Sequence, residues 1–102
     1  MITLAQYKIK YEECYKRMVR VRNLASALTD GRFWFGATSL RLDIEHFMKT
    51  IESVYKAYTT APSFQSKDFT MYVKKLEQDV KDFEELLVKT KEISEANKKN
   101  GY

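Results

Sequence analysis

Apolar side chains recur in alternating steps of three and four along three separate stretches of this 102-residue chain. Such steps keep the side chains on one stripe of an α-helix, and that stripe must be buried against other helices. The stripes consist of Leu4, Tyr7, Tyr11, Cys14, Met18, Val21, Ala25 and Leu28; then Leu40, Ile44, Phe47, Ile51, Val54 and Tyr58; then Phe69, Val73, Leu76, Val80, Phe83 and Leu87. The pattern predicts an all-α fold, an antiparallel three-helix bundle with long, heptad-patterned helices.

Capping and turn residues set the expected ends of the helices. A capping box formed by Thr3 and Gln6 begins the first helix. Thr38 or Ser39 can cap the second, and the segment around Pro62 separates it from the third. The helices are expected at about residues 3–28, 38–58 and 66–96 of a single domain that spans residues 1–102, with residues 97–102 as a frayed tail.

Charged residues beside the stripes predict which helices are neighbours. The chain carries a net charge of +4, with 18 basic and 14 acidic residues, and the surplus lies before Ala37. Basic residues flank the first stripe and acidic residues flank the third: Lys8, Lys10, Arg17 and Arg22 against Glu77, Asp79 and Glu84. Because opposite charges at flanking positions select helix partners, the first and third helices should lie side by side and parallel.

The basic first helix is a candidate phosphate-binding surface, formed by Lys16, Arg17, Arg20 and Arg22. Such a surface would bind the backbone of a nucleic acid. The alternative is that most of these cations neutralise the third helix or are solvated. Both interpretations stay open at the level of the sequence.

Three consecutive aromatic residues follow a basic one in the first connection, Arg32-Phe33-Trp34-Phe35. Exposed aromatic and arginine side chains are typical of the residues that dominate binding energy at protein interfaces, so these four residues are a candidate partner-binding site. Aromatic side chains can also stack on bases of a single strand. The alternative is that the aromatics close the end of the bundle as a hydrophobic plug.

Additional apolar residues widen the stripes beyond what a three-helix core needs: Tyr15, Val19, Met48, Tyr55, Leu86 and Ile93. This excess predicts an oligomer surface or a groove for a partner. The tyrosines can instead lie along the surface with hydrated hydroxyl groups.

The sequence Trp34-Phe35-Gly36 resembles the W-x-G turn of WXG100-type secreted proteins, which are helical on both sides of that turn. Ala37 and Phe47 resemble the small and aromatic positions after it. The resemblance covers at most residues 1–60 and implies a secreted helical hairpin. A third heptad helix and a strongly basic first helix depart from that family.

Arg41 and His46 have the R-x4-H spacing that resembles the ribonuclease motif of HEPN domains, helical bundles that work as dimers. The resemblance implies that the arginine holds a phosphate and the histidine transfers a proton. His46 is the only histidine, and the polar residue usual after the arginine is Leu42 here. A surface histidine without catalytic function is the alternative.

No other enzyme constellation is visible, and the single Cys14 lacks a second cysteine or a nearby histidine with which to bind a metal. No cofactor, metal site or catalytic residue is therefore expected, and no membrane partner, because no apolar run is long enough for a membrane span. We expect a cytoplasmic, non-enzymatic protein-binding module, an adaptor, inhibitor or assembly factor that self-associates. The alternative is a nucleic-acid-binding protein. Small basic helical proteins of this kind are typical of phage and mobile-element products.

Overall fold

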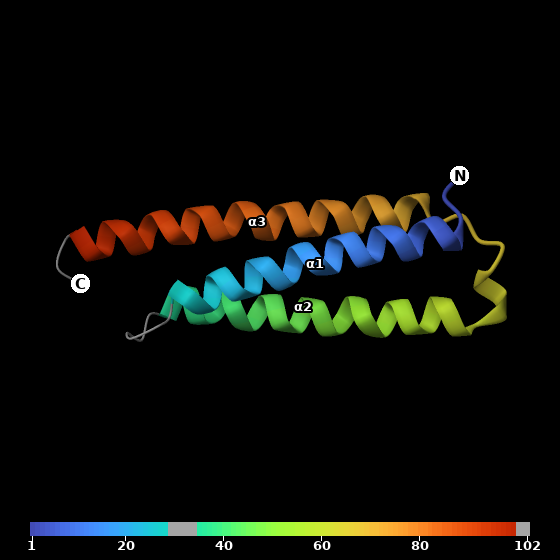
Figure 1. Cartoon of the computed structure of the whole chain (residues 1–102), viewed down its shortest axis with the longest axis horizontal. Helices are drawn as coiled ribbons and strands as arrows, with labels where there is room; N and C mark the ends of the chain where they lie inside the picture. The colour runs from blue at the N-terminus through green and yellow to red at the C-terminus, as the bar shows by residue number, and fades with distance from the viewer. Residues whose placement is uncertain (29–34, 100–102) are drawn as a thin grey trace.

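The computed structural model describes residues 1–28 and 35–99, apart from the side chains of residue 35 and of residues 97–99. It contains three long helices and one short one: α1 (Leu4–Leu28), α2 (Phe35–Thr60), the 3-10 helix η1 (Pro62–Phe64) and α3 (Thr70–Lys99). They form an elongated bundle 56 Å long, with α2 antiparallel to α1 and α3 (Figure 1). The predicted all-α three-helix bundle is confirmed.

Local side-chain chemistry explains where α1 and α2 begin and end. The capping box is confirmed: the Thr3 amide donates to Gln6 Oε1 at 2.9 Å, and the Gln6 amide donates to Thr3 Oγ1 at 3.3 Å. α2 begins earlier than residue 38, so the expected cap at Thr38 or Ser39 is wrong and both lie inside the helix. The burial of Ala37, at 0% exposure, gives this first turn a place in the core.

The chain also leaves α2 later and enters α3 later than expected. α2 was expected to end at about residue 58 but continues to Thr60. The Thr60 hydroxyl donates to the Lys56 carbonyl at 2.7 Å. α3 begins at Thr70, four residues after the expected position. Asp68 explains this start, because its Oδ1 accepts hydrogen bonds from the Thr70 amide at 3.0 Å and from the Ile2 amide at 3.1 Å. α3 then runs to Lys99, three residues beyond the expected end.

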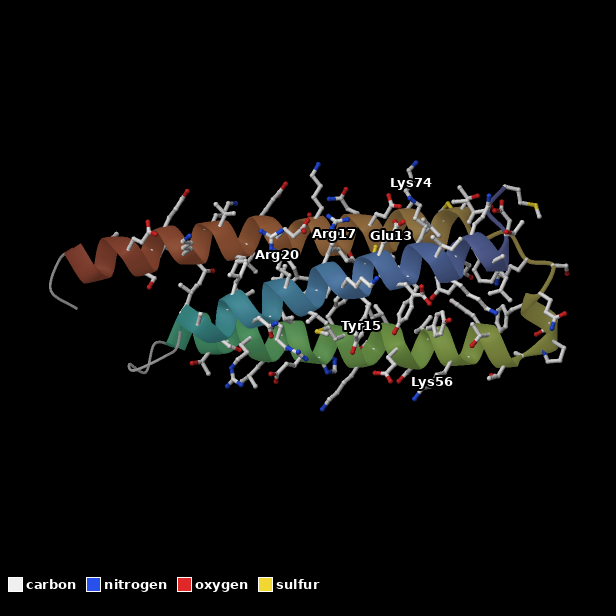
Figure 2. The ribbon with its side chains drawn as sticks, in the orientation of Figure 1. Glu13, Tyr15, Arg17, Arg20, Lys56 and Lys74 are labelled. Atoms are coloured by element: carbon white, nitrogen blue, oxygen red, sulfur yellow. The ribbon has the colours of Figure 1, made fainter. Side chains whose placement is uncertain are left out.

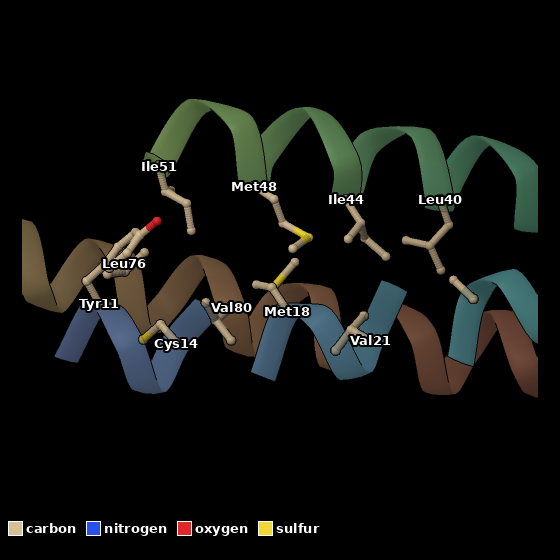
Figure 3. Close-up of a cluster of buried hydrophobic side chains, with 11 residues drawn as sticks. Tyr11, Cys14, Met18, Val21, Leu40, Ile44, Met48, Ile51, Leu76 and Val80 are labelled. Atoms are coloured by element: carbon tan, nitrogen blue, oxygen red, sulfur yellow. The ribbon is translucent and has the colours of Figure 1, made fainter. Parts of the chain in front are cut away.

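The core is built from one stripe of each helix. Met18, Ile44 and Val80, which come from α1, α2 and α3, all have an exposure of 0%. Figure 3 shows the α2 side chains facing those of α1 across this interface. The stripe of α3 continues beyond Leu87 with two small polar residues, because Thr90 and Ser94 are buried as well.

The register of α2 differs from the expected one. Met48 is buried at 4% exposure, whereas Val54, expected in the core, is 38% exposed. Tyr55 also faces α1, where its ring stacks on Tyr11 with centroids 4.1 Å apart. α2 is therefore rotated so that the Met48 and Tyr55 side of its wide apolar face meets α1.

This rotation corrects the expected oligomer surface. Of the six residues assigned to it, four pack in or against the core: Tyr15, Val19, Met48 and Tyr55. Leu86 and Ile93 stay exposed, at 45% and 54%. Both belong to α3.

Ion pairs confirm that α1 and α3 are parallel neighbours. Lys10 Nζ lies 3.6 Å from Glu77 Oε1, and Arg17 Nε donates to Glu84 Oε2 at 3.1 Å. Both pairs join residues 67 positions apart, and a constant separation requires two helices that run side by side in the same direction. Arg22 lies five residues after Arg17, which turns it by about 140° to the other flank of α1.

The acidic flank of α3 needs one correction as well. Asp79 was expected to face the basic residues of the first helix, but its carboxylate lies 3.5 Å from Lys75 Nζ, one turn earlier in α3. Asp79 also lines a groove on the α2 side of α3. The described ion pairs between α1 and α3 are therefore those of Lys10 and Arg17.

Reversing Arg17 to Glu should lower the melting temperature slightly, and adding Glu84→Arg should restore part of the loss. The pair is partly exposed, so its contribution is about 0.2–1 kcal/mol. Thermal unfolding followed by circular dichroism measures both changes, with Lys16→Glu as a control of equal charge at an exposed position. A double variant no more stable than Arg17→Glu would show that the two side chains do not interact.

The same pair has a defined pH dependence. The Arg17 hydrogen bond lowers the pKa of the Glu84 carboxyl below its ordinary value. A carboxyl with a lowered folded-state pKa stabilises the fold above its unfolded pKa and loses that contribution as the pH falls through the folded value. The stability difference between the wild type and Arg17→Glu should therefore shrink in acid below about pH 4.

Candidate functional site

An apolar groove with a volume of about 400 Å³ lies between α2 and α3. α2 contributes Phe47, Thr50, Ile51, Val54 and Tyr58; α3 contributes Tyr72, Lys75, Leu76 and Asp79; α1 contributes Tyr7. In the described part of the chain, α1 packs along both other helices, whereas α2 and α3 have few direct contacts. The groove follows from this arrangement, because the two outer helices share a neighbour and leave a trough between them.

Two pairs of aromatic rings bridge α2 and α3 and define the extent of the groove. Phe47 and Phe83 have ring centroids 5.0 Å apart, and Tyr58 and Tyr72 have centroids 5.2 Å apart. Between these bridges the lining side chains of α2 are smaller, as at Val54. Large rings thus set the spacing of the two helices, and smaller side chains leave the space between them unfilled.

Polar groups lie at the Tyr58 end of the groove. A hydrogen bond from Lys67 lowers the pKa of Tyr72, and Lys67 Nζ also lies 5.1 Å from the centroid of that ring. Burial raises the pKa of Tyr58, and burial and neighbouring tyrosines raise the pKa of Tyr7 to about 12. Tyr7 and Tyr58 are therefore protonated at neutral pH.

The predicted partner-binding connection cannot be compared with the structure. Arg32, Phe33 and Trp34 lie outside the described residues. Phe35 is the first residue of α2, but its side chain lies outside the description. The role of these four residues stays a prediction.

The structure separates the four residues of the predicted phosphate-binding surface. Lys16 and Arg20 are exposed and, four residues apart, share the outer face of α1. Arg17 turns to α3 and is paired with Glu84, while Arg22 is half-buried on the opposite flank. Figure 2 shows Arg17 and Arg20 close to the line along which α1 meets α3.

Acidic groups lie among these cations. The hydrogen bond from Arg17, together with the charges of Arg17 and Arg20, lowers the pKa of the Glu84 carboxyl. Glu13 lies 3.8 Å from Lys10. The α1–α3 boundary is therefore a mixed surface in which positive and negative charges alternate.

The residues of the R-x4-H motif do not converge within one chain. Arg41 is half-buried and lies 3.6 Å from Glu45, and its Nε is buried with no hydrogen-bond partner among the described atoms. His46 is exposed and lies five residues further, about 140° around α2. Arg41 is thus half-buried beside Glu45, whereas His46 faces solvent on another side of α2.

No group of three or more metal-ligating side chains occurs among residues 1–28 and 35–99. Cys14 is buried at 2% exposure, and burial raises the pKa of its thiol. Such a thiol is a poor nucleophile and a poor metal ligand at neutral pH.

The widened apolar face of α2, which predicted an oligomer surface or a groove for a partner, is the sequence signal for this groove. α2 has two adjacent apolar stripes, one through Phe47 and Val54 and one through Met48 and Tyr55. A helix with one neighbour needs one stripe, whereas two stripes indicate two contact surfaces. The first stripe forms the groove wall and the second meets α1.

No protein-family model, curated protein or solved structure matches this chain. The resemblances to WXG100-type and HEPN proteins therefore stay predictions. None of the described helices combines the length and apolar character needed to cross a bilayer.

Proposed function

We propose that this chain is a non-enzymatic protein-binding module and that the groove between α2 and α3 receives an amphipathic helix. The observation that carries the proposal is the groove itself, an apolar trough between two helices that have few direct contacts in the described part of the chain. Helices commonly bind such troughs through apolar residues at positions i, i+3, i+4 and i+7. A fourth helix would give α2 and α3 a second shared neighbour besides α1 and complete a four-helix bundle.

The dimensions of the groove favour a helix as its occupant. Its α2 wall extends from Phe47 to Tyr58, which corresponds to about 17 Å or three helical turns. Val54 in this wall is 38% exposed, so an incoming apolar side chain would remove existing apolar surface from water. The Lys75 and Asp79 pair at the α3 wall offers one charge of each sign to polar residues of the incoming helix.

Changing Val54 to Glu should abolish partner binding and leave the fold largely intact, because this exposed position tolerates a charge in the free protein but not under an apolar helix. Ser53→Glu, an exposed neighbour that does not line the groove, is the matched control. Affinity capture from the native cells, with and without nuclease, measures binding by the wild type and by both variants. A protein partner that both variants retain, or one released by nuclease, would contradict the proposal.

Nucleic-acid binding is the second candidate, and the shared exposure of Lys16 and Arg20 supports it. Since Arg17 is paired, we expect about two phosphate contacts per chain, and thus a salt slope near −1.4 on a single strand. Titration of a short oligonucleotide at several salt concentrations measures this slope. An absence of binding at low salt would remove this candidate.

The predicted location, molecular role and origin of the protein are also proposals. A cytoplasmic location, and a role as adaptor, inhibitor or assembly factor, agree with a small helical binding module. A phage or mobile-element origin is a suggestion from composition alone.

A further inference from the structure

We propose that the helix that fills the groove is α3 of a second copy of this chain, packed antiparallel about a two-fold axis near Leu86. This inference rests on the proposed function and names the occupant of the same groove. Each copy would insert the C-terminal half of its α3 into the groove of the other. The result is a closed dimer with two identical contacts.

A single stripe of α3 supplies both sides of this contact. Tyr72, Asp79, Leu86 and Ile93 follow one another in steps of seven, and such residues stay on one helical face. The first two line the groove, whereas Leu86 and Ile93 are 45% and 54% exposed. One half of the stripe is thus a receptor surface, and the other half is an exposed apolar ridge.

The spacing along the stripe makes the two halves fit. Leu86 lies seven residues from both Asp79 and Ile93, which is about 10 Å along the helix in each direction. An antiparallel two-fold axis at Leu86 therefore places Ile93 of the second copy beside Asp79, at the groove. There it would meet the apolar side chains of Phe47 and Leu76.

Charge complementarity selects the antiparallel arrangement. The same axis brings Asp82 next to Lys89 of the second copy, and the symmetry repeats this pair on the other side. Both side chains are exposed in the single chain. A parallel arrangement in register would instead place Asp79 and Asp82 against their own copies, and like charges at close range repel each other.

The shape of the bundle leaves this ridge accessible. The C-terminal turns of α3 extend past the ends of α1 and α2 (Figure 1). A second α3 can lie along this extension and continue into the groove. The second copy therefore explains the length of α3, the exposed pair Leu86 and Ile93, and the unfilled groove together.

Sedimentation equilibrium tests the dimer at micromolar concentrations. The wild type should have a mass of about 24 kDa, twice the 12.1 kDa of one chain. Leu86→Glu and Ile93→Glu should each raise the dissociation constant by about 30-fold or more, as expected for anchor residues at an interface. Val88→Glu is the matched control: Val88 is 56% exposed but lies on the other side of α3, so this variant should remain dimeric.

Cysteine trapping tests the position of the axis. Leu86→Cys should form a disulfide with its own copy under mild oxidation, because the two residues meet at the axis, whereas Val88→Cys should not. The native Cys14 is buried and is present in both variants. Asp82→Lys should weaken the dimer, and Asp82→Lys combined with Lys89→Asp should restore it.

A mass of 12.1 kDa at every concentration would overturn the dimer, and so would an equal loss of association in Val88→Glu and Leu86→Glu. Cross-linking through residue 88 in place of residue 86 would overturn the arrangement. A different result would refute the proposed function, namely that Val54→Glu captures the same partners as the wild type. A monomeric wild type that loses a partner through Val54→Glu would refute the second copy as occupant and leave the groove as a binding site for another protein's helix.

Discussion

Phe69→Ala should destabilise the protein more than any change at an exposed position. Phe69 has an exposure of 0% and lies immediately before α3. Its ring centroid is 5.0 Å from that of Tyr7 and 5.5 Å from that of Tyr58, so one side chain joins α3 to both other helices. Removing a buried aromatic ring costs about 3–5 kcal/mol, out of a total stability of about 5–15 kcal/mol for a domain.

Urea unfolding followed by circular dichroism measures this loss directly. In a domain of this size a loss of about 3 kcal/mol lowers the melting temperature by about 12 °C or more. Met71→Ala is the matched control, because Met71 lies two residues further in the same helix and is 78% exposed. A similar loss in both variants would mean that Phe69 does not organise this end of the bundle.

The backbone around Phe69 gives a second reason for a large effect. The Phe69 amide donates to the Ile2 carbonyl at 2.9 Å, and Asp68 accepts a hydrogen bond from the Ile2 amide. The segment before α1 is thus attached to the start of α3. Loosening the packing at Phe69 should therefore release the N-terminal residues as well.

The first helix was predictable from the sequence because its signals are local and agree with one another. The capping box at Thr3 and Gln6 fixes its start, and six of its eight stripe residues are buried. The charge pattern also predicted its parallel neighbour correctly, since Lys10 and Arg17 both pair with α3. Periodicity and charge are properties of the sequence itself, so no tertiary information was needed.

The rotation of α2, which decides which of its two apolar stripes forms the groove, could not be predicted in the same way. The groove exists because α1 packs against both other helices, while the rings of Phe83 and Tyr72 in α3 contact aromatic rings of α2 and hold the two helices apart. These contacts depend on the rotation of each helix about its axis, which small packing differences decide. The partner-binding role predicted for the aromatic connection, Arg32 to Phe35, stays a prediction, because these side chains lie outside the described residues.

Met48→Ala should therefore cost much more stability than Val54→Ala, which tests the rotation of α2. The predicted stripe placed Val54 in the core and Met48 at its edge, whereas the structure gives exposures of 38% and 4%. Truncating a buried methionine costs about 2–5 kcal/mol, because it removes apolar contacts and leaves a cavity. At the partly exposed Val54 we expect about 1 kcal/mol or less, because less apolar surface returns to water.

Denaturant unfolding of the two alanine variants measures the difference, with Met71→Ala again marking the effect of truncation at an exposed site. Equal losses at positions 48 and 54 would mean that both stripes of α2 are buried in the free protein. The groove would then be closed, and the binding site proposed between α2 and α3 would not exist. A large loss at Met48 and a small one at Val54 would instead show that α2 keeps one apolar stripe for its own core and holds the other available for a second helix.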